Sequence, residues 1–115
     1  MIKLDNMWWI VLLTTVIILE LIADVLSKQW SLQPQALFLI GGIFFYLVAN
    51  IAWLLALRSG VGLARGVSIF SVVCAIAATI IGLVYYKESV SGLQFVGIIL
   101  GVISLFFIFW HDIFI

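Results

Sequence analysis

The sequence predicts an all-α integral membrane protein in which four helices form one bundle. Of its 115 residues, 67% are hydrophobic and only 9% are charged, whereas about a quarter of the residues in a soluble domain are charged. Four apolar stretches are each long enough for a membrane span, which takes about 20 helical residues. A soluble domain of this size needs more polar surface than these residues supply, so an ordinary cytosolic protein is excluded.

The predicted spans follow one another with short connections. They cover approximately Met7–Ser27, Ala36–Leu57, Gly66–Tyr86 and Val90–Trp110. Their apolar residues run continuously instead of alternating with polar ones, which indicates helices rather than strands. Short connections force neighbouring spans to run antiparallel, so we expect a single domain, 1–115, with both termini on one side of the membrane.

Composition also excludes several classes of function. The formal net charge is zero, so no basic surface is available for nucleic acid. One cysteine, Cys74, and one histidine, His111, exclude a disulfide framework and a metal site built from several such ligands. No nucleophile and base stand in a catalytic pattern, so we expect neither an enzyme nor a cofactor.

The charges outside the spans barely favour one orientation in the membrane. Lys3, Arg58 and, if it lies outside its span, Arg65 are on one side, and Lys28 and Lys87 are on the other. The positive-inside rule reads orientation from such an asymmetry. Two interpretations remain open. Either the protein is inserted in both orientations, which pair with each other, or a single charged residue decides the orientation and the termini are cytoplasmic.

Two acidic residues lie inside the first predicted span. Glu20 is within one turn of its middle, where an ionised carboxylate costs roughly 3 kcal/mol or more. Asp24 follows one turn later on the same helix face. Acids at such depths are candidate proton or cation sites. The alternatives are a structural ion pair or hydrogen bond for Glu20 and a hydrated position near the helix end for Asp24.

The second span offers a face that matches these acids. Tyr46, Asn50 and Trp53 are spaced i, i+4, i+7, so they project together. Aromatic rings beside a carboxylate suit an organic cation, because ring faces attract positive charge. Equally, Trp53 is compatible with an anchor at the membrane interface, and Asn50 with a hydrogen bond between helices.

Small residues form stripes on the last two spans, and small residues let helices approach closely in lipid. On the fourth span, Gly97, Gly101 and Ser104 follow the pattern of a helix dimerisation face, so we expect the contact between subunits there. On the third span the stripe serves either close packing or a substrate chamber, and it comprises Ala64, Ser68, Ser71, Ala75, Ala78 and Gly82.

The chain resembles the small multidrug resistance family, the minimal branch of the drug/metabolite transporter superfamily, over roughly residues 8–110. Glu20 and Lys28 keep the spacing between the family's essential glutamate and a following lysine. Tyr46 stands where a substrate-facing tyrosine is usual. Two further segments resemble the family's third-helix start and the superfamily's third-to-fourth connection: Gly62-Leu63-Ala64, and Tyr86-Lys87-Glu88-Ser89 with Gln94 and Gly97.

The chain also departs from the family pattern. Arg65 and Ser68 stand where a tyrosine and a tryptophan usually line the binding site, and Asp24 replaces a small residue. Ile69, Phe70 and Val72 replace most of the usual Ser-Gly-x-Gly kink. The chain therefore resembles a divergent member.

The resemblance implies an antiparallel, dual-topology homodimer in a bacterial inner membrane, with Glu20 of both subunits in one chamber. It implies proton-coupled export of small organic cations, with Glu20 and Asp24 binding proton and substrate. The chamber candidates are Tyr46, Asn50, Trp53, Arg65 and Ser68. Two alternatives stay open: a flippase for lipids or lipid-linked headgroups in which Arg65 meets a phosphate, or a non-transport scaffold subunit. A heterodimer with a paralogue is a further possibility.

Overall fold

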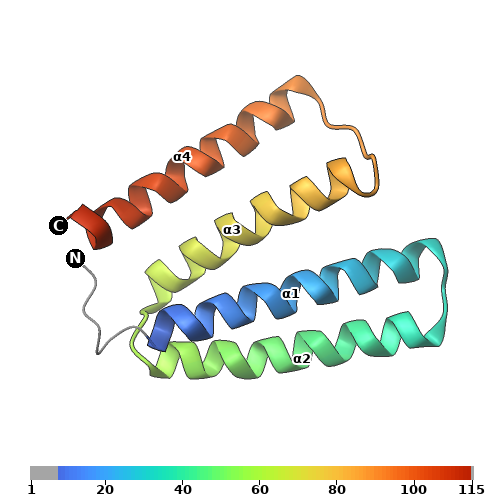
Figure 1. Cartoon of the computed structure of the whole chain (residues 1–115), viewed down its shortest axis with the longest axis horizontal. Helices are drawn as coiled ribbons and strands as arrows, with labels where there is room; N and C mark the ends of the chain where they lie inside the picture. Colours follow the sequence, from blue (N-terminus) through green and yellow to red (C-terminus); the bar gives the residue numbers. More distant parts are fainter. Residues whose placement is uncertain (1–7, 115) are drawn as a thin grey trace.

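The computed structural model describes residues 8–114 as four helices, with side chains described for residues 8–110. Each helix is long and apolar enough to cross a membrane, and the part of the chain from 8 to 114 contains no strand. The predicted all-α fold of four membrane-length helices is therefore confirmed. The helices are α1 (Trp8–Leu32), α2 (Ala36–Arg58), α3 (Leu63–Val84) and α4 (Gly92–Phe114) (Figure 1). The predictions about Lys3 and the side chain of His111 fall outside the described residues.

Several helix ends differ from the sequence-based boundaries, among them the end of α1 and the start of α3. Helix α1 continues past Ser27 to Leu32, because the residues after Ser27 include no glycine or proline until Pro34, which disfavours helix in the residue before it. Helix α3 begins at Leu63 instead of Gly66, directly after Gly62, whose φ of 82° few other residues adopt. Lys28 and Arg65, expected near or in connections, are thus helical.

The four helices lie side by side in the order α2, α1, α3, α4 (Figure 1). Helices that follow one another in the sequence run antiparallel, so α1 and α3, which are neighbours in this row, run parallel. The molecule measures 46 × 35 × 18 Å. Because a helix with its side chains is about 10–12 Å across, the shortest dimension holds less than two helices. Contacts are most extensive between α1 and α2, and α4 contacts mainly α3. One face of most helices therefore remains available to lipid or to a second protein.

Small residues bring α1 and α2 together. A Cβ atom at Gly42 would lie 3.4 Å from Ser27 Oγ and 3.8 Å from the Ala23 carbonyl oxygen. Such close approach gains van der Waals contact, the main driving force for helix association in lipid. The buried small residues of this contact are Ala23, Gly42, Ala49, Ala52 and Ala56. They make α1 and α2 the tightest helix pair of the molecule.

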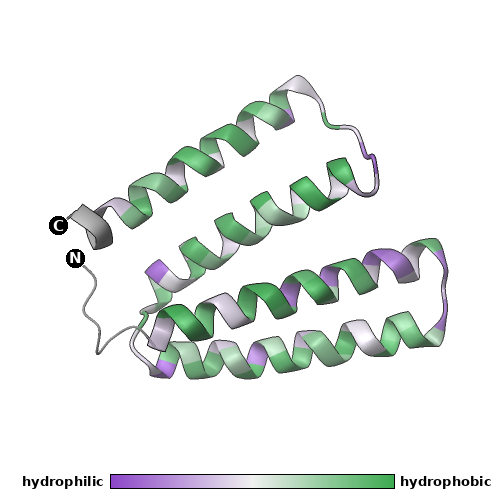
Figure 2. Ribbon diagram, in the orientation of Figure 1, coloured by the Kyte–Doolittle hydropathy of each residue, from purple (hydrophilic) through white to green (hydrophobic). Residues whose placement is uncertain are grey.

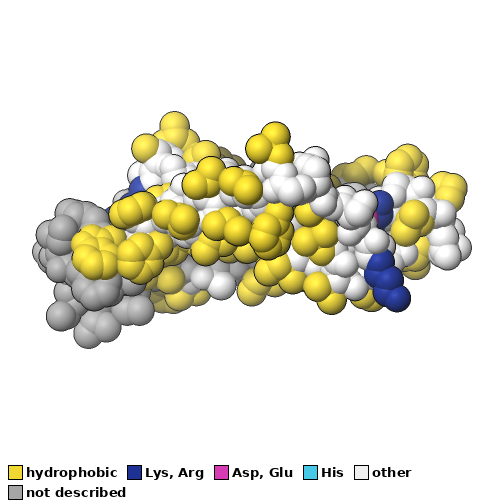
Figure 3. Space-filling model, turned by 90° about the horizontal axis from the view of Figure 1, so that it is seen from above, with side chains coloured by type: hydrophobic (Ala, Val, Ile, Leu, Met, Phe, Trp, Pro, Cys, Tyr) yellow, Lys and Arg dark blue, Asp and Glu magenta, His cyan; other side chains and the backbone are white. Residues whose placement is uncertain are grey.

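Apolar side chains cover most of the outer surface. Figure 3 shows hydrophobic side chains along the visible face, with lysine and arginine only toward its two ends. Figure 2 shows hydrophilic residues at the turns and along α1, while α3 and α4 are apolar through their middle. Between residues 92 and 110, α4 buries no residue. This distribution fits a protein whose outer face contacts hydrocarbon.

Candidate functional site

Glu20 lines a cavity of about 220 Å³ between α1, α2 and α3. It is the middle residue of α1 and therefore lies near the centre of the span. Residues from all three helices complete the lining: Val16, Asn50, Trp53, Val67, Phe70 and Ser71. Of the residues singled out from the sequence as a substrate site, the cavity brings together Glu20, Asn50 and Trp53.

The cavity combines one carboxylate with two aromatic rings and two neutral polar groups. The ring centroids of Trp53 and Phe70 are 5.9 Å apart, with an angle of 41° between the ring planes. Gly66 makes room for the indole, because a Cβ atom there would lie 3.1 Å from Trp53 Cη2. Ring faces attract a cation, and a carboxylate neutralises it. The lining therefore suits a small organic cation.

The cavity opens at the surface of the single chain. Glu20 is half-buried, whereas Asn50 and Ser71 are exposed. Glu20 forms no ion pair with any residue between 8 and 110, so the alternative of a structural ion pair is not realised among these residues. Hydrocarbon offers no hydrogen-bond partners. Water or a second protein is therefore needed beside Asn50 and Ser71.

Asp24 and Tyr46 form a separate group one turn along α1. Tyr46 Oη donates a hydrogen bond of 2.6 Å to Asp24 Oδ1. Ser27 Oγ lies 2.8 Å from the Ala23 carbonyl oxygen and 3.4 Å from Tyr46 Oη, within hydrogen-bond distance of both. These contacts join α1 to α2. Neither Asp24 nor Tyr46 lines the Glu20 cavity; Asp24 instead borders a smaller one of about 110 Å³.

A polar contact joins α1 to the connection between α3 and α4. Lys28 Nζ lies 3.3 Å from Glu88 Oε2 and 5.6 Å from the centroid of the Tyr86 ring. Gln29 Nε2 donates a hydrogen bond of 3.1 Å to the Tyr86 hydroxyl. The sequence indicated Lys28 by its charge beside a span and by the family resemblance, and Glu88 by the resemblance alone. The spacing of the residues in the sequence does not predict that these two distant segments pair.

We expect the Lys28–Glu88 pair to contribute little to stability. The two side chains are 36% and 52% exposed, and exposed ion pairs contribute roughly 0–1 kcal/mol. Glu88→Gln should therefore lower the free energy of unfolding by less than about 1 kcal/mol, and high salt should remove the difference. Unfolding in mixed micelles at two salt concentrations measures this. A salt-independent loss of more than about 2 kcal/mol would show that the pair is not screened by solvent.

Arg65 and Ser68 lie outside the lining of the Glu20 cavity. The guanidinium carbon of Arg65 is 4.3 Å from the centroid of the Trp9 ring, so α1 and α3 meet there through a cation–π contact. Ser68 Oγ donates a hydrogen bond of 2.7 Å to the Ala64 carbonyl oxygen. The lining instead includes Ser71, a member of the small-residue stripe that the sequence assigned to close packing or a substrate chamber. It also includes Phe70, which the sequence could assign to a chamber only once the face of α3 that meets α1 is known.

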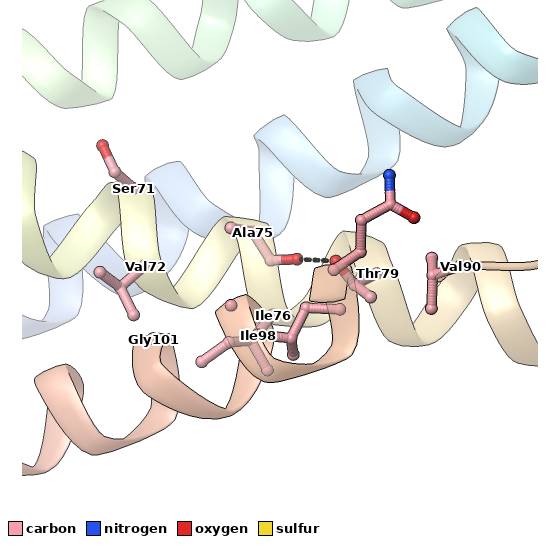
Figure 4. A pocket seen from close by; sticks show the side chains of 10 residues that line it. Ser71, Val72, Ala75, Ile76, Thr79, Val90, Ile98 and Gly101 are labelled. Atoms are coloured by element: carbon pink, nitrogen blue, oxygen red, sulfur yellow. Dashed lines mark hydrogen bonds between the residues drawn. The ribbon is translucent and has the colours of Figure 1, made fainter. Parts of the chain in front are cut away.

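Gly97 and Gly101 face α3 of their own chain across a cavity of about 490 Å³. Figure 4 shows Gly101 and Ile98 opposite Val72 and Ala75 across this space. A Cβ atom at Gly97 would meet nothing within 4 Å. Ser104 is exposed, and its Oγ donates a hydrogen bond of 3.0 Å to the Leu100 carbonyl oxygen. The predicted subunit contact at these residues concerns a second chain and stays a prediction.

No protein-family model, curated protein or solved structure matches this chain. Function is therefore inferred from the cavity geometry and from the physical cost of placing a carboxylate inside a membrane.

Proposed function

We propose that the protein is a proton-coupled transporter that exports small organic cations, in the manner of the small multidrug resistance family. The observation that supports this most strongly is the position of Glu20. It is the middle residue of a membrane-length helix and lines a cavity with Asn50, Trp53 and Phe70. A carboxylate at this depth is costly unless it binds a proton or a cation.

In this mechanism a proton and a cation compete for Glu20. The carboxylate binds the cation only when it is ionised, with Trp53 and Phe70 adding their ring faces. Protonation removes the negative charge and releases the cation. Two opposed conformations around a central site then expose Glu20 alternately to each side of the membrane.

The transporter acts as an antiparallel dimer in our proposal, most simply a homodimer. The exposed polar side chains of Asn50 and Ser71 at the mouth of the cavity support this, because lipid does not satisfy them. A second copy covers them and brings its own Glu20 into the same chamber. The near balance of lysine and arginine between the two ends favours insertion in both orientations. A bacterial inner membrane is the proposed location.

Purified protein in liposomes provides the direct test. With a pH gradient across the membrane, a panel of monovalent ammonium and guanidinium ions should include at least one that moves uphill as protons move the other way. Fluorescent pH dyes and cation-sensitive electrodes follow the two fluxes separately. If no cation in the panel moves protons, the proposal is wrong.

Dual insertion predicts a specific labelling result. A cysteine added at the C-terminus, in a Cys74→Ser background that removes the only native thiol, should be labelled by a membrane-impermeant maleimide in about half of the molecules on intact cells. Permeabilised cells give the total. Complete or absent labelling on intact cells would show a single orientation and would contradict the antiparallel homodimer.

A further inference from the structure

Titratable side chains extend from Glu20 in only one direction along α1. Asp24 and Lys28 follow at successive intervals of four residues, so the three side chains lie on one face of the helix. Between the start of α1 and Glu20 the helix has no titratable residue. The two hydroxyl groups of that half, on Thr14 and Thr15, donate to carbonyl oxygens of the same helix. Polar groups of α1 therefore lead from Glu20 only toward the end that carries Lys28.

A small cavity connects Asp24 with this end of the helix. It has a volume of about 110 Å³, and its lining includes Asp24, Lys28 and Tyr86. Lys28 lies eight residues beyond Glu20, about 12 Å along the helix, and its side chain is 36% exposed. Half of the hydrocarbon core is about 15 Å thick, so this end is close to the membrane surface. The size and polar lining of the cavity suit a short file of water molecules between Asp24 and the surface.

The Asp24 carboxylate is held by one of its two oxygen atoms. Tyr46 Oη donates a hydrogen bond of 2.6 Å to Asp24 Oδ1. Among residues 8–110, no donor bonds the other oxygen, Oδ2, which therefore remains for a proton. Glu20 is one helical turn away, and side chains at this spacing have Cβ atoms about 5–6 Å apart. One water molecule is enough to carry a proton between two such carboxyl groups.

We propose that Asp24 relays protons between water at the Lys28 end of α1 and Glu20, a role that rests on the proposed transport function. A proton from the cavity water binds Asp24 Oδ2. The neutral carboxyl group then gives this proton to a bridging water molecule, which in turn gives one of its own protons to the Glu20 carboxylate. Asp24 is ionised again, and the protonated Glu20 releases its cation. The same transfers in reverse return the proton to water.

The proposed antiparallel dimer gives this relay a use on both sides of the membrane. In two opposed copies, the ends of α1 that carry Lys28 point to opposite membrane surfaces. One Asp24 then lies on each side of the central pair of Glu20 side chains. Each of the two conformations of the transporter therefore has its own route for protons, even though a single chain offers only one.

The other titratable groups around Asp24 are poor candidates for the relay. A phenol or a thiol is too weak an acid to pass protons on readily at neutral pH, and the ion pair lies beyond Asp24 toward the exposed end. These groups are Tyr46, Cys74, Tyr86 and the pair of Lys28 with Glu88. Among the described residues of α1, Asp24 is the carboxyl group between Glu20 and the membrane surface.

The test separates proton-driven flux from cation exchange in liposomes. It uses radiolabelled guanidinium, tetramethylammonium and the other ions of the panel described above. Net flux driven by a pH gradient requires proton transfer, whereas exchange of labelled for unlabelled cation at equal pH does not. Asp24→Asn keeps an oxygen that accepts the Tyr46 hydrogen bond but carries no proton. It should slow pH-driven flux by about tenfold or more and change cation exchange by less than about twofold.

Tyr46→Phe makes the complementary change, because it removes the hydrogen bond and keeps the carboxyl group. It should slow pH-driven flux by less than about threefold, the effect of one lost neutral hydrogen bond. A merely structural role for the bond predicts the reverse order, with the larger loss in Tyr46→Phe and equal losses of both kinds of flux. Asp24→Glu restores a proton-carrying group and should recover most of the pH-driven flux.

Several results would overturn the relay. Equal pH-driven flux in the wild type and Asp24→Asn would show that protons reach Glu20 by another route. Equal loss of pH-driven flux and cation exchange in folded Asp24→Asn would give Asp24 a structural role. If Asp24→Asn does not fold, Tyr46→Phe decides, because loss of both fluxes there makes the bond structural and retention of both supports the relay. A wild type that moves no cation of the panel in either assay would instead refute the transport function itself.

Discussion

Replacing Glu20 by glutamine is expected to reduce proton-coupled cation flux in liposomes to the level of protein-free vesicles. Glutamine has nearly the same shape and still forms hydrogen bonds, but it neither carries negative charge nor exchanges a proton. Among the residues whose side chains the structure describes, the lining of this cavity contains no other acid. The variant therefore loses both the group that binds the cation and the group that couples its movement to protons.

Glu88→Gln is the matched control, because it makes the same chemical change outside the Glu20 cavity. Glu88 lies in the connection between α3 and α4 and pairs with Lys28. This variant should keep the pH-driven flux of the wild type. Uphill flux in Glu20→Gln that still follows the pH gradient would disprove the mechanism. An equal loss in both variants would show that the flux depends on general integrity and not on the central carboxylate.

The membrane-spanning elements were predictable from the sequence because hydrocarbon imposes a simple rule. A helix must be apolar over about 20 residues, and all four helices satisfy this. The same rule made Glu20 stand out, since a carboxylate in such a stretch needs a specific reason. Glu20 shares its cavity with Asn50 and Trp53 of the face that the spacing indicated, whereas Tyr46 of that face contacts Asp24 instead.

The faces through which the helices meet were much harder to predict. In a soluble protein an apolar stripe marks the buried side of a helix, but lipid is as apolar as the protein interior, so this contrast is lost. The sequence drew attention to the small residues of α3 and α4, whereas α1 and α2 form the closest contact around Ala23 and Gly42. The sequence matched the face of Tyr46 to the two acids, but it did not predict that Tyr46 bonds Asp24 rather than joining Glu20 in the cavity.

This difference between helix pairs leads to a large expected effect on stability. Ala23 is 0% exposed and lies in the close contact between α1 and α2. Ala23→Leu inserts three extra carbon atoms where the backbones already approach, and overpacking of this kind costs about 1–3 kcal/mol. The free energy of unfolding, measured by steric trapping in bilayers, should fall by that amount. The fall reflects strain and a forced separation of the two helices.

Ala75→Leu makes the same substitution on α3 and should behave differently. Ala75 is exposed and lines the cavity of about 490 Å³ between α3 and α4 (Figure 4). The larger side chain finds space there and gains contacts across the cavity, so we expect a change of less than about 0.5 kcal/mol or a small gain. Equal destabilisation by both variants would mean that α3 and α4 pack as closely as α1 and α2. An unaffected Ala23→Leu would mean that the contact around Gly42 is loose enough to admit a leucine.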